Sequence, residues 1–261
     1  MILDGKKLAG EILARSCARA TELPHPPRVA AVVADEVAAR SYLSIKQKSA
    51  AQAGCTFEVI SLGTSFASAD AALIQLPLPP EMDGEAVLNT IPLAQDADVL
   101  SDAARTKFEL GEAGALLPPV VGAVAEILKD VPVAGKKAVV IGAGFLVGAP
   151  VATWLRQQGA IVTVVTIDSK PENFIAGLIA ADVIVSGAGK AGLITPDLIK
   201  EGVVLIDAGT SEQGGVLKGD ADPACADKCS LFTPVPGGVG PVAVAKLFEN
   251  VVELATRRLV A

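Results

Sequence analysis

Short aliphatic runs alternate with amphipathic stretches over most of this chain, and this alternation predicts an α/β protein. Apolar positions recur at helical spacing in residues 5–22, where Asp4 can cap the helix, and again in 35–53. Three aliphatic runs are typical of buried strands: 28–33, 56–62 and 72–76. Only residues 63–71 separate the last two runs, which is short for the helical crossover of a parallel strand pair.

The alternation becomes regular after residue 137. Strands are expected at 138–142, 161–165, 183–186 and 203–207, with helices at 146–158 and 171–180. This pattern predicts a doubly wound parallel sheet of the Rossmann type. We expect a short helix and an irregular acidic loop in 83–114, a helix at 118–129, and one amphipathic helix at 242–260.

Composition narrows the class of protein. A chain of 261 residues is long for one compact domain, so two lobes are expected. The chain is 51% hydrophobic but only 3% aromatic, so its core is built from small aliphatic side chains. A net charge of −7 without a cluster of basic residues argues against nucleic-acid binding. We find no signal-peptide core and no apolar run of membrane-spanning length, and we therefore expect a cytoplasmic protein without a membrane partner.

The cysteines do not form a metal-binding pattern. Only Cys225 and Cys229 are near neighbours, whereas Cys17 and Cys55 stand alone and the single histidine, His25, lies in a proline-rich turn. We therefore expect no bound metal, and we expect free, buried thiols in a reducing compartment.

A glycine-rich segment, residues 142–148, falls between a predicted strand and a predicted helix. Glycines there allow a tight turn and let backbone N–H groups approach a pyrophosphate. Its spacing, G-x-G-x-x-x-G, is one residue longer than the usual fingerprint, and a structural turn without ligand remains an alternative. The surrounding strand ends favour dinucleotide binding, because Asp168 falls where an acid that binds ribose is expected. The candidate cofactor-binding residues are Gly142, Ala143, Gly144, Gly148, Thr166, Asp168, Ser169, Gly187, Gly189, Asp207 and Gly209.

Three further segments carry longer motifs. They are Ser41-Tyr42-Leu43-Ser44-Ile45-Lys46-Gln47-Lys48, Ile74-Gln75-Leu76-Pro77-Leu78-Pro79 and Thr233-Pro234-Val235-Pro236-Gly237-Gly238-Val239-Gly240-Pro241. They resemble, in the same order, the Y-x-x-x-K helix, the Q-L-P-L-P strand end and the P-G-G-V-G-P loop of the bifunctional methylenetetrahydrofolate dehydrogenase/cyclohydrolase family. With a similar opening segment, residues 2–6, the resemblance covers essentially the whole chain.

The resemblance implies catalytic roles for three residues. Lys46 would be the acid/base group that also positions water, Tyr42 would pack against the folate, and Gln75 would hydrogen-bond the lysine and orient it. From the residues alone, Lys46 could equally be a solvated helix lysine, Tyr42 a half-buried aromatic, and Gln75 a strand-end amide that satisfies loop backbone.

The resemblance also implies contacts with the pterin ring. Asp98 resembles the second acid of the family's D-V-D-G segment, although Val99 stands where the family has glycine. The expected backbone contacts come from Gly237, Gly238, Val239, Gly240 and Pro241. Other departures are Ala143-Gly144 in place of the family's arginine and serine, the loss of a threonine in 117–122, and the apparent absence of a helix before residue 72.

The family fold implies a folate lobe, residues 1–117 and 242–261, beside a dinucleotide-binding domain, 118–241, with a cleft between them. The implied activity oxidises 5,10-methylene-tetrahydrofolate with NAD or NADP and then hydrolyses the methenyl product to 10-formyl-tetrahydrofolate. A homodimer without metal is expected. Two alternatives stay open: a dehydrogenase with weak or lost cyclohydrolase activity, and a non-catalytic dinucleotide-binding protein.

The cofactor preference follows from charge. A 2′-phosphate needs cationic or strong donor partners, and Ala143 replaces the family's arginine. Asp168 could accept from the ribose hydroxyls of NAD but would repel a 2′-phosphate. Lys170 could offset that repulsion, and Thr166 could face the ribose instead. We therefore predict a preference for NAD over NADP.

Overall fold

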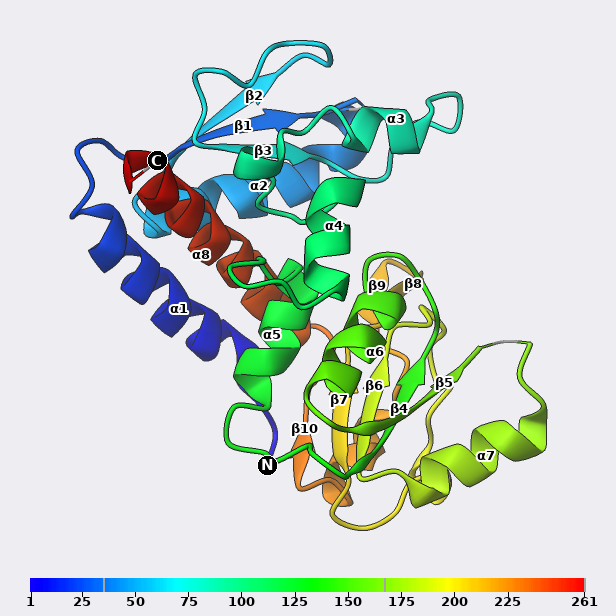
Figure 1. Cartoon of the computed structure of the whole chain (residues 1–261). Helices are drawn as coiled ribbons and strands as arrows, with labels where there is room; N and C mark the ends of the chain where they lie inside the picture. The colour runs from blue at the N-terminus through cyan, green and yellow to red at the C-terminus, as the bar shows by residue number, and fades with distance from the viewer. Residues whose placement is uncertain (35, 167, 261) are drawn as a thin grey trace. The chain divides into compact units, whose positions relative to one another are not determined.

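The computed structural model describes residues 1–34, 36–166 and 168–260, except for the side chains of 36–42, 213 and 260 (Figure 1). The chain divides into two compact units. The five-strand unit comprises Met1–Leu8 and Val120–Ala243, and the three-strand unit comprises Ala9–Pro119 and Val244–Ala261. Within the described part of the chain, no helix combines the length and the apolar character that crossing a membrane requires.

The five-strand unit is built on a parallel sheet. Its strands are β4 (Lys137–Ile141), β5 (Ile161–Val165), β6 (Val183–Ser186), β7 (Val204–Asp207) and β10 (Leu231–Phe232). They lie in the order β10-β7-β6-β4-β5, which confirms the doubly wound sheet predicted from the sequence. The chain moves outward from β4 to β5 and then crosses back to β6. The boundary between β4 and β6 is therefore the topological switch point, where ligands bind in such sheets.

Helices and short elements surround this sheet. They are α5 (Pro119–Ile127), α6 (Gly148–Gln157), α7 (Pro171–Ala180), η2 (Pro196–Leu198), η3 (Pro223–Asp227) and the hairpin of β8 (Ser211–Gln213) and β9 (Val216–Lys218). α6 packs against β4 and β5, and α7 packs against β4. Because parallel crossovers are right-handed, these two helices cover opposite faces of the sheet. Buried aliphatic side chains fill the space between α7 and the sheet, among them Val139, Leu178, Ile184 and Leu205.

The three-strand unit has a smaller parallel sheet. Its strands are β1 (Arg28–Val32), β2 (Thr56–Ile60) and β3 (Ala71–Ile74), in the order β2-β1-β3. β2 and β3 flank β1 and do not pair with each other, and residues 61–70 connect them without a helix. The absence of a helix between these two strands agrees with the prediction from the sequence. Phe66 and Ala69 are buried in this connection and join the core of the unit, so the short crossover still covers the sheet.

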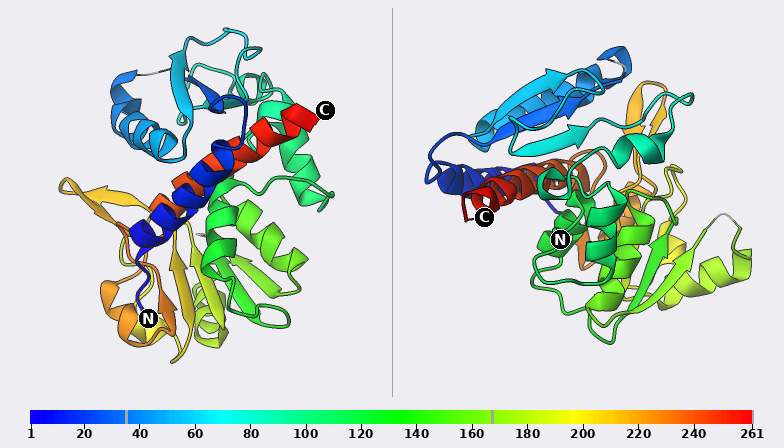
Figure 2. Two further views of the ribbon diagram at one scale, coloured as in Figure 1. Left: turned by 90° about the vertical axis from the view of Figure 1, so that its left-hand side faces the viewer. Right: turned by 45° about the horizontal axis from the view of Figure 1, so that its top comes forward.

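Helices complete the three-strand unit. They are α1 (Gly5–Ala20), α2 (Glu36–Gln52), α3 (Gly84–Leu88), η1 (Leu93–Gln95), α4 (Asp102–Glu109) and α8 (Val239–Val260). Asp4 caps α1 as predicted, because its carboxylate accepts the N–H of Lys7 at 3.0 Å. Figure 2 shows α1 and α8 running alongside each other, and Arg19 on α1 donates to Glu253 on α8 at 2.6 Å.

Several elements differ from the prediction. α4 replaces most of the expected irregular loop, since Ser101 caps it and Ala104 and Phe108 bury one face of an otherwise charged helix. The β8–β9 hairpin and β10 were not predicted. α6 begins two residues later than expected, and α8 begins three residues earlier. The first eight residues, assigned above to the folate lobe, belong to the five-strand unit, where Leu3 donates its N–H to the carbonyl of Phe232 at 2.8 Å.

Candidate functional site

The three-strand unit brings together two candidate residues that lie on separate elements. Lys46 projects from α2, and its Nζ lies 3.9 Å from Oδ2 of Asp98, with 15% and 20% of the two side chains exposed. Burial raises the pKa of the Asp98 carboxyl, the charge of Lys46 opposes this rise, and the neighbouring Asp96 adds to it. The result is a cation and a carboxylate in a largely desolvated setting, where charge interactions are stronger than in water.

A tight turn fixes Asp98. The side chain of Asp96 is buried and accepts the N–H groups of Leu100 and Ser101 at 3.0 and 2.8 Å, and the Ser101 hydroxyl at 2.7 Å. Val99 lies inside this turn with φ of +56°, a backbone conformation that costs a β-branched residue free energy. The turn therefore holds Asp98 in one orientation beside Lys46.

Gln75 follows β3 directly and is 8% exposed. Its backbone N–H donates to Val32 at 2.9 Å, and its Nε2 donates to the carbonyl of Leu76 at 2.6 Å. Its Oε1 is buried without a hydrogen-bond partner among the described atoms. A buried acceptor without a donor is costly, so this oxygen suits a donor that a ligand brings. No direct hydrogen bond joins the described side chains of Gln75 and Lys46, and their expected coupling stays a prediction.

The structure says less about the remaining candidates for folate contact, Tyr42 and residues 237–241. Tyr42 lies on α2, but its side chain is outside the described set, so its role stays a prediction. All five residues from Gly237 to Pro241 belong to the five-strand unit, and the last three of them form the first turn of α8 and not a loop.

The backbone around these glycines is closely packed. Gly237 has φ of +103°. A Cβ on Gly238 would lie 2.5 Å from the carbonyl oxygen of Pro234, and one on Gly5 would lie 2.0 Å from that of Gly238. Glycine is therefore needed here for packing within the unit, whatever the segment binds.

The five-strand unit has a cavity of about 810 Å³ at the carboxyl ends of β4, β5 and β6. Six predicted cofactor-binding residues line it: Gly142, Ala143, Gly144, Thr166, Ser169 and Gly187. Phe174, Ile175, Leu193 and Leu198 add apolar walls. The cavity, referred to below as the dinucleotide cavity, lies at the switch point between β4 and β6, where a nucleotide is expected.

Close backbone contacts form one wall of the dinucleotide cavity. Gly142 has φ of +94°, and a Cβ on Gly148 would lie 2.0 Å from the carbonyl oxygen of Gly142. A Cβ on Gly187 would lie 2.6 Å from Cγ1 of Val147. Glycine therefore lets the turn and the start of α6 meet backbone to backbone, and lets the Val147 side chain pack directly on the end of β6. The residues present fit a dinucleotide, because such a turn lets backbone approach a pyrophosphate.

Five other predicted cofactor residues do not line the dinucleotide cavity. They are Gly148, Asp168, Gly189, Asp207 and Gly209. Gly148 is buried in the packed turn just described, and Asp168 is exposed just after the end of β5. The Asp207 side chain is 1% exposed and accepts the N–H groups of Gly209 and Ala221 at 3.0 and 2.8 Å. Asp207 thus anchors a loop inside the unit.

Sequence reasoning missed a second buried acid, Asp220. It is fully buried and accepts the Ser186 hydroxyl at 2.5 Å, the N–H of Ala188 at 2.8 Å and the N–H of Lys190 at 2.6 Å. A Cβ on Gly209 would lie 2.1 Å from its carboxylate, so that glycine serves close packing. Asp220 therefore fixes the loop after β6, which forms one side of the cavity. Its only sequence signal is an acid that follows a glycine after the β8–β9 hairpin.

Comparison with known proteins gives one consistent family. Residues 118–259 match the NAD(P)-binding domain of the tetrahydrofolate dehydrogenase/cyclohydrolase family. The chain is 35% identical to the bifunctional protein FolD of Methanospirillum hungatei, over 99% of this chain and 98% of that protein. Two crystal structures are similar over nearly the full length of both chains.

The first is the bifunctional FolD methylenetetrahydrofolate dehydrogenase/cyclohydrolase of Campylobacter jejuni. It is 30% identical with a TM-score of 0.90, and the match covers 99% of each chain. The second is the FolD enzyme of Trypanosoma brucei in complex with NADP and an inhibitor. It is 29% identical with a TM-score of 0.92, and the match covers 100% of this chain and 99% of that one.

Proposed function

Since this chain belongs to the tetrahydrofolate dehydrogenase/cyclohydrolase family, we propose that it interconverts folate one-carbon units in two steps. In the first, 5,10-methylene-tetrahydrofolate loses a hydride to NAD or NADP and becomes the methenyl cation. In the second, water adds to that cation, a proton leaves, and the ring opens to 10-formyl-tetrahydrofolate. The observation that carries the proposal is the Lys46–Asp98 pair in a largely buried setting.

The hydrolytic step needs a group that positions water and accepts its proton. Lys46 would enter this step as the neutral amine, take the proton and become the ammonium group that pairs with Asp98, and proton transfer by a positioned side chain accelerates reactions by roughly 100-fold or more. Asp98 lies 3.9 Å from the ammonium group and fixes its direction. The carboxylate would also interact favourably with the positive methenyl carbon, because opposite charges attract strongly where water is excluded.

Gln75 supports substrate orientation in this proposal. Its Oε1 is buried and lacks a donor among the described atoms, while its Nε2 is bound to the neighbouring carbonyl of Leu76. A pterin ring carries N–H donors that could satisfy this oxygen. Asp98 and Gln75 together would then hold the reacting carbon at a fixed distance from Lys46.

The five-strand unit supplies the redox half of the proposal. NAD or NADP accepts the hydride when bound, and the chain contributes placement. The glycine turn of residues 142–144 lines the dinucleotide cavity and would offer backbone N–H groups to the pyrophosphate. Apolar walls from Phe174, Ile175 and Leu193 suit an adenine ring.

A dehydrogenase with weak or lost cyclohydrolase activity is the second candidate. Ala143 and Gly144 in the glycine turn and Val99 beside Asp98 depart from the family pattern and favour it. The described contacts of Lys46 favour the bifunctional reading, because its carboxylate partner lies within 4 Å and is mostly buried.

The two candidates separate in one assay. Formation of reduced cofactor and of methenyl-tetrahydrofolate is followed by absorbance, and the decay of added methenyl-tetrahydrofolate is followed separately. We expect Lys46→Met to lower the hydrolysis rate on the order of 100-fold and to lower hydride transfer much less, because hydride transfer depends mainly on geometry. Lys48→Met is the matched control, since Lys48 is an exposed lysine on the same helix. A Lys46→Met variant that hydrolyses methenyl-tetrahydrofolate at the parent rate excludes Lys46 as the base.

We propose NAD as the preferred cofactor. Ala143 removes a donor to a 2′-phosphate, and the exposed Asp168 lies just beyond β5, the strand whose end carries ribose-binding residues in such folds. The same assay with both cofactors measures kcat/KM. A tenfold or greater preference for NADP contradicts this proposal.

We further propose a cytoplasmic homodimer. β2 lies at the edge of its sheet, with Val59 exposed on the strand and Leu62 exposed just after it, and such edges are commonly covered in folded proteins. The four cysteines are free, and burial raises the pKa of Cys55 and Cys225 to about 12, which suits inert thiols in a reducing compartment. Light scattering on the purified protein measures the mass, and a monomer at working concentration contradicts the dimer.

A further inference from the structure

Lys190 is the one charged side chain that lines the dinucleotide cavity among the residues described. It follows β6 by four residues and lies in a loop of small residues, 186–190. Within the described chain, its ammonium group has neither an ion pair nor a hydrogen bond. A cation lining a concave site without a protein partner is available to an anionic group of a ligand.

The buried carboxylate of Asp220 holds the backbone of Lys190 in place. Its N–H donates to Oδ1 of Asp220 at 2.6 Å, and Oδ2 of the same carboxylate holds Ser186 and Ala188. Asp220 is fully buried, so the three contacts form a rigid base for the loop. The lysine therefore begins from a fixed position, and only its flexible side chain has to adjust to a ligand.

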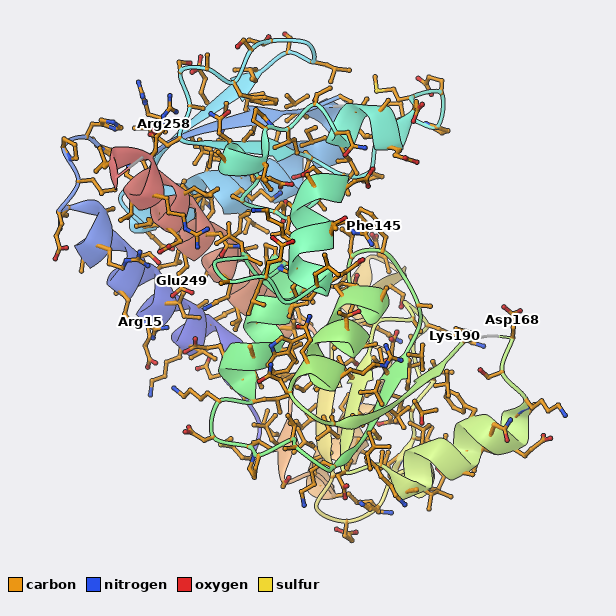
Figure 3. All side chains as sticks on the ribbon, viewed as in Figure 1. Arg15, Phe145, Asp168, Lys190, Glu249 and Arg258 are labelled. Carbon is orange, nitrogen blue, oxygen red and sulfur yellow. The ribbon has the colours of Figure 1, made fainter. Side chains whose placement is uncertain are left out.

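Lys190 faces the same cavity as the residues after β5. Thr166 and Ser169 line that cavity, and the Thr166 N–H donates to the Ser169 hydroxyl at 2.9 Å. Figure 3 draws the side chains of Lys190 and Asp168 at this same end of the sheet. By contrast, Lys170, the cation expected from the sequence to face a phosphate, precedes α7 and does not line the cavity.

We propose that Lys190 binds the 2′-phosphate of NADP and thereby limits the preference for NAD that Asp168 favours. This inference rests on the proposed dinucleotide-dependent function. The loop after β6 would then supply the cation that Ala143 does not provide, from a part of the chain far from the glycine turn. The enzyme would use NADP measurably, although less well than NAD.

Charge makes the proposal selective between the two cofactors. A 2′-phosphate carries nearly two negative charges, whereas NAD has a neutral hydroxyl at that position. Both cofactors share the pyrophosphate. Removing the Lys190 side chain should therefore weaken NADP binding strongly and NAD binding little. If Lys190 contacted the pyrophosphate instead, its removal would weaken the binding of both cofactors equally.

The test measures equilibrium binding to the whole chain by titration calorimetry, with NAD, NADP, 5′-AMP and adenosine 2′,5′-bisphosphate as ligands. We expect Lys190→Met to raise the Kd for NADP and for the bisphosphate roughly tenfold and the Kd for NAD and 5′-AMP less than about threefold. Lys190→Arg, which keeps the charge, should retain most of the NADP affinity. Asp168→Ser should act in the opposite direction and tighten NADP. Lys218→Met, at an exposed position of β9 in the same unit, is the matched control.

Three results overturn the inference while the proposed function stands: equal losses for both cofactors, no change in either, or selective loss of NADP in Lys170→Met instead. A parent protein that binds neither NAD nor NADP contradicts the proposed function itself. Circular dichroism of each variant shows whether the fold is retained, and Lys190→Arg keeps the test decisive if Lys190→Met does not fold.

Discussion

Replacing Asp207 with asparagine should remove much of the pH dependence of stability in the five-strand unit. The Asp207 side chain is 1% exposed, and burial raises its pKa from 3.8 to about 6, although backbone N–H groups donate to the carboxylate and oppose the rise. Ionising this carboxyl therefore costs more free energy in the folded chain than in the unfolded chain.

The magnitude follows from the two pKa values. The contribution to stability is complete below pH 3.8 and is lost as the pH rises through about 6. The difference of about two units corresponds to roughly 3 kcal/mol in total, at about 1.36 kcal/mol per unit. Roughly 2 kcal/mol of this loss falls between about pH 4.5 and about pH 7.5. The asparagine variant has no charge to bury and should gain about that amount on the parent over the same interval.

Urea unfolding followed by tryptophan fluorescence measures this difference. Trp154 is the single tryptophan of the chain and lies, 9% exposed, on α6 of the same unit. Asp227→Asn, at an exposed position of that unit, is the control and should follow the parent at every pH. A free-energy difference between parent and Asp207→Asn that stays constant across this pH range refutes the argument.

Two further substitutions test the backbone of the candidate sites. Gly148→Ala places a Cβ 2.0 Å from the carbonyl oxygen of Gly142, and the backbone shift that this contact forces should weaken NAD binding tenfold or more. The control, Gly10→Ala, adds a Cβ in open space on α1 and should leave NAD binding unchanged; equal calorimetric Kd values for the two variants would contradict this prediction. In thermal unfolding, Val99→Gly should lower the free energy of unfolding by at least about 1 kcal/mol less than Val29→Gly, because both valines are buried but only Val99 has a positive φ that glycine relieves. Equal losses of stability in the two variants would show that the backbone of Val99 is not strained.

The sequence by itself determined the local elements and the family. The bounds of β5, α7 and β6 match the predicted ranges, because a buried strand or an amphipathic helix is specified by side chains a few residues apart. The glycine turn after β4 could be located for the same reason. The Y-x-x-x-K, Q-L-P-L-P and P-G-G-V-G-P motifs were sufficient to indicate the family that the comparisons then showed.

Local patterns gave a poor account of elements that depend on distant packing. α4 carries four charged side chains among its eight residues and was predicted as a loop, yet Ala104 and Phe108 bury its inner face. The β8–β9 hairpin is largely exposed and short, so it lacks the alternation that marks a strand.

Only the tertiary structure decided which side chains meet. Lys46 and Asp98 were candidates for separate roles, and the fold places them 3.9 Å apart because the turn held by Asp96 lies beside α2. Asp220 had no predicted role, and its importance comes from three donors in the loop after β6. The same loop places Lys190 on the wall of the dinucleotide cavity. Sequence periodicity records which face of an element is buried, but the partner across a sheet or beneath a loop depends on how the elements pack.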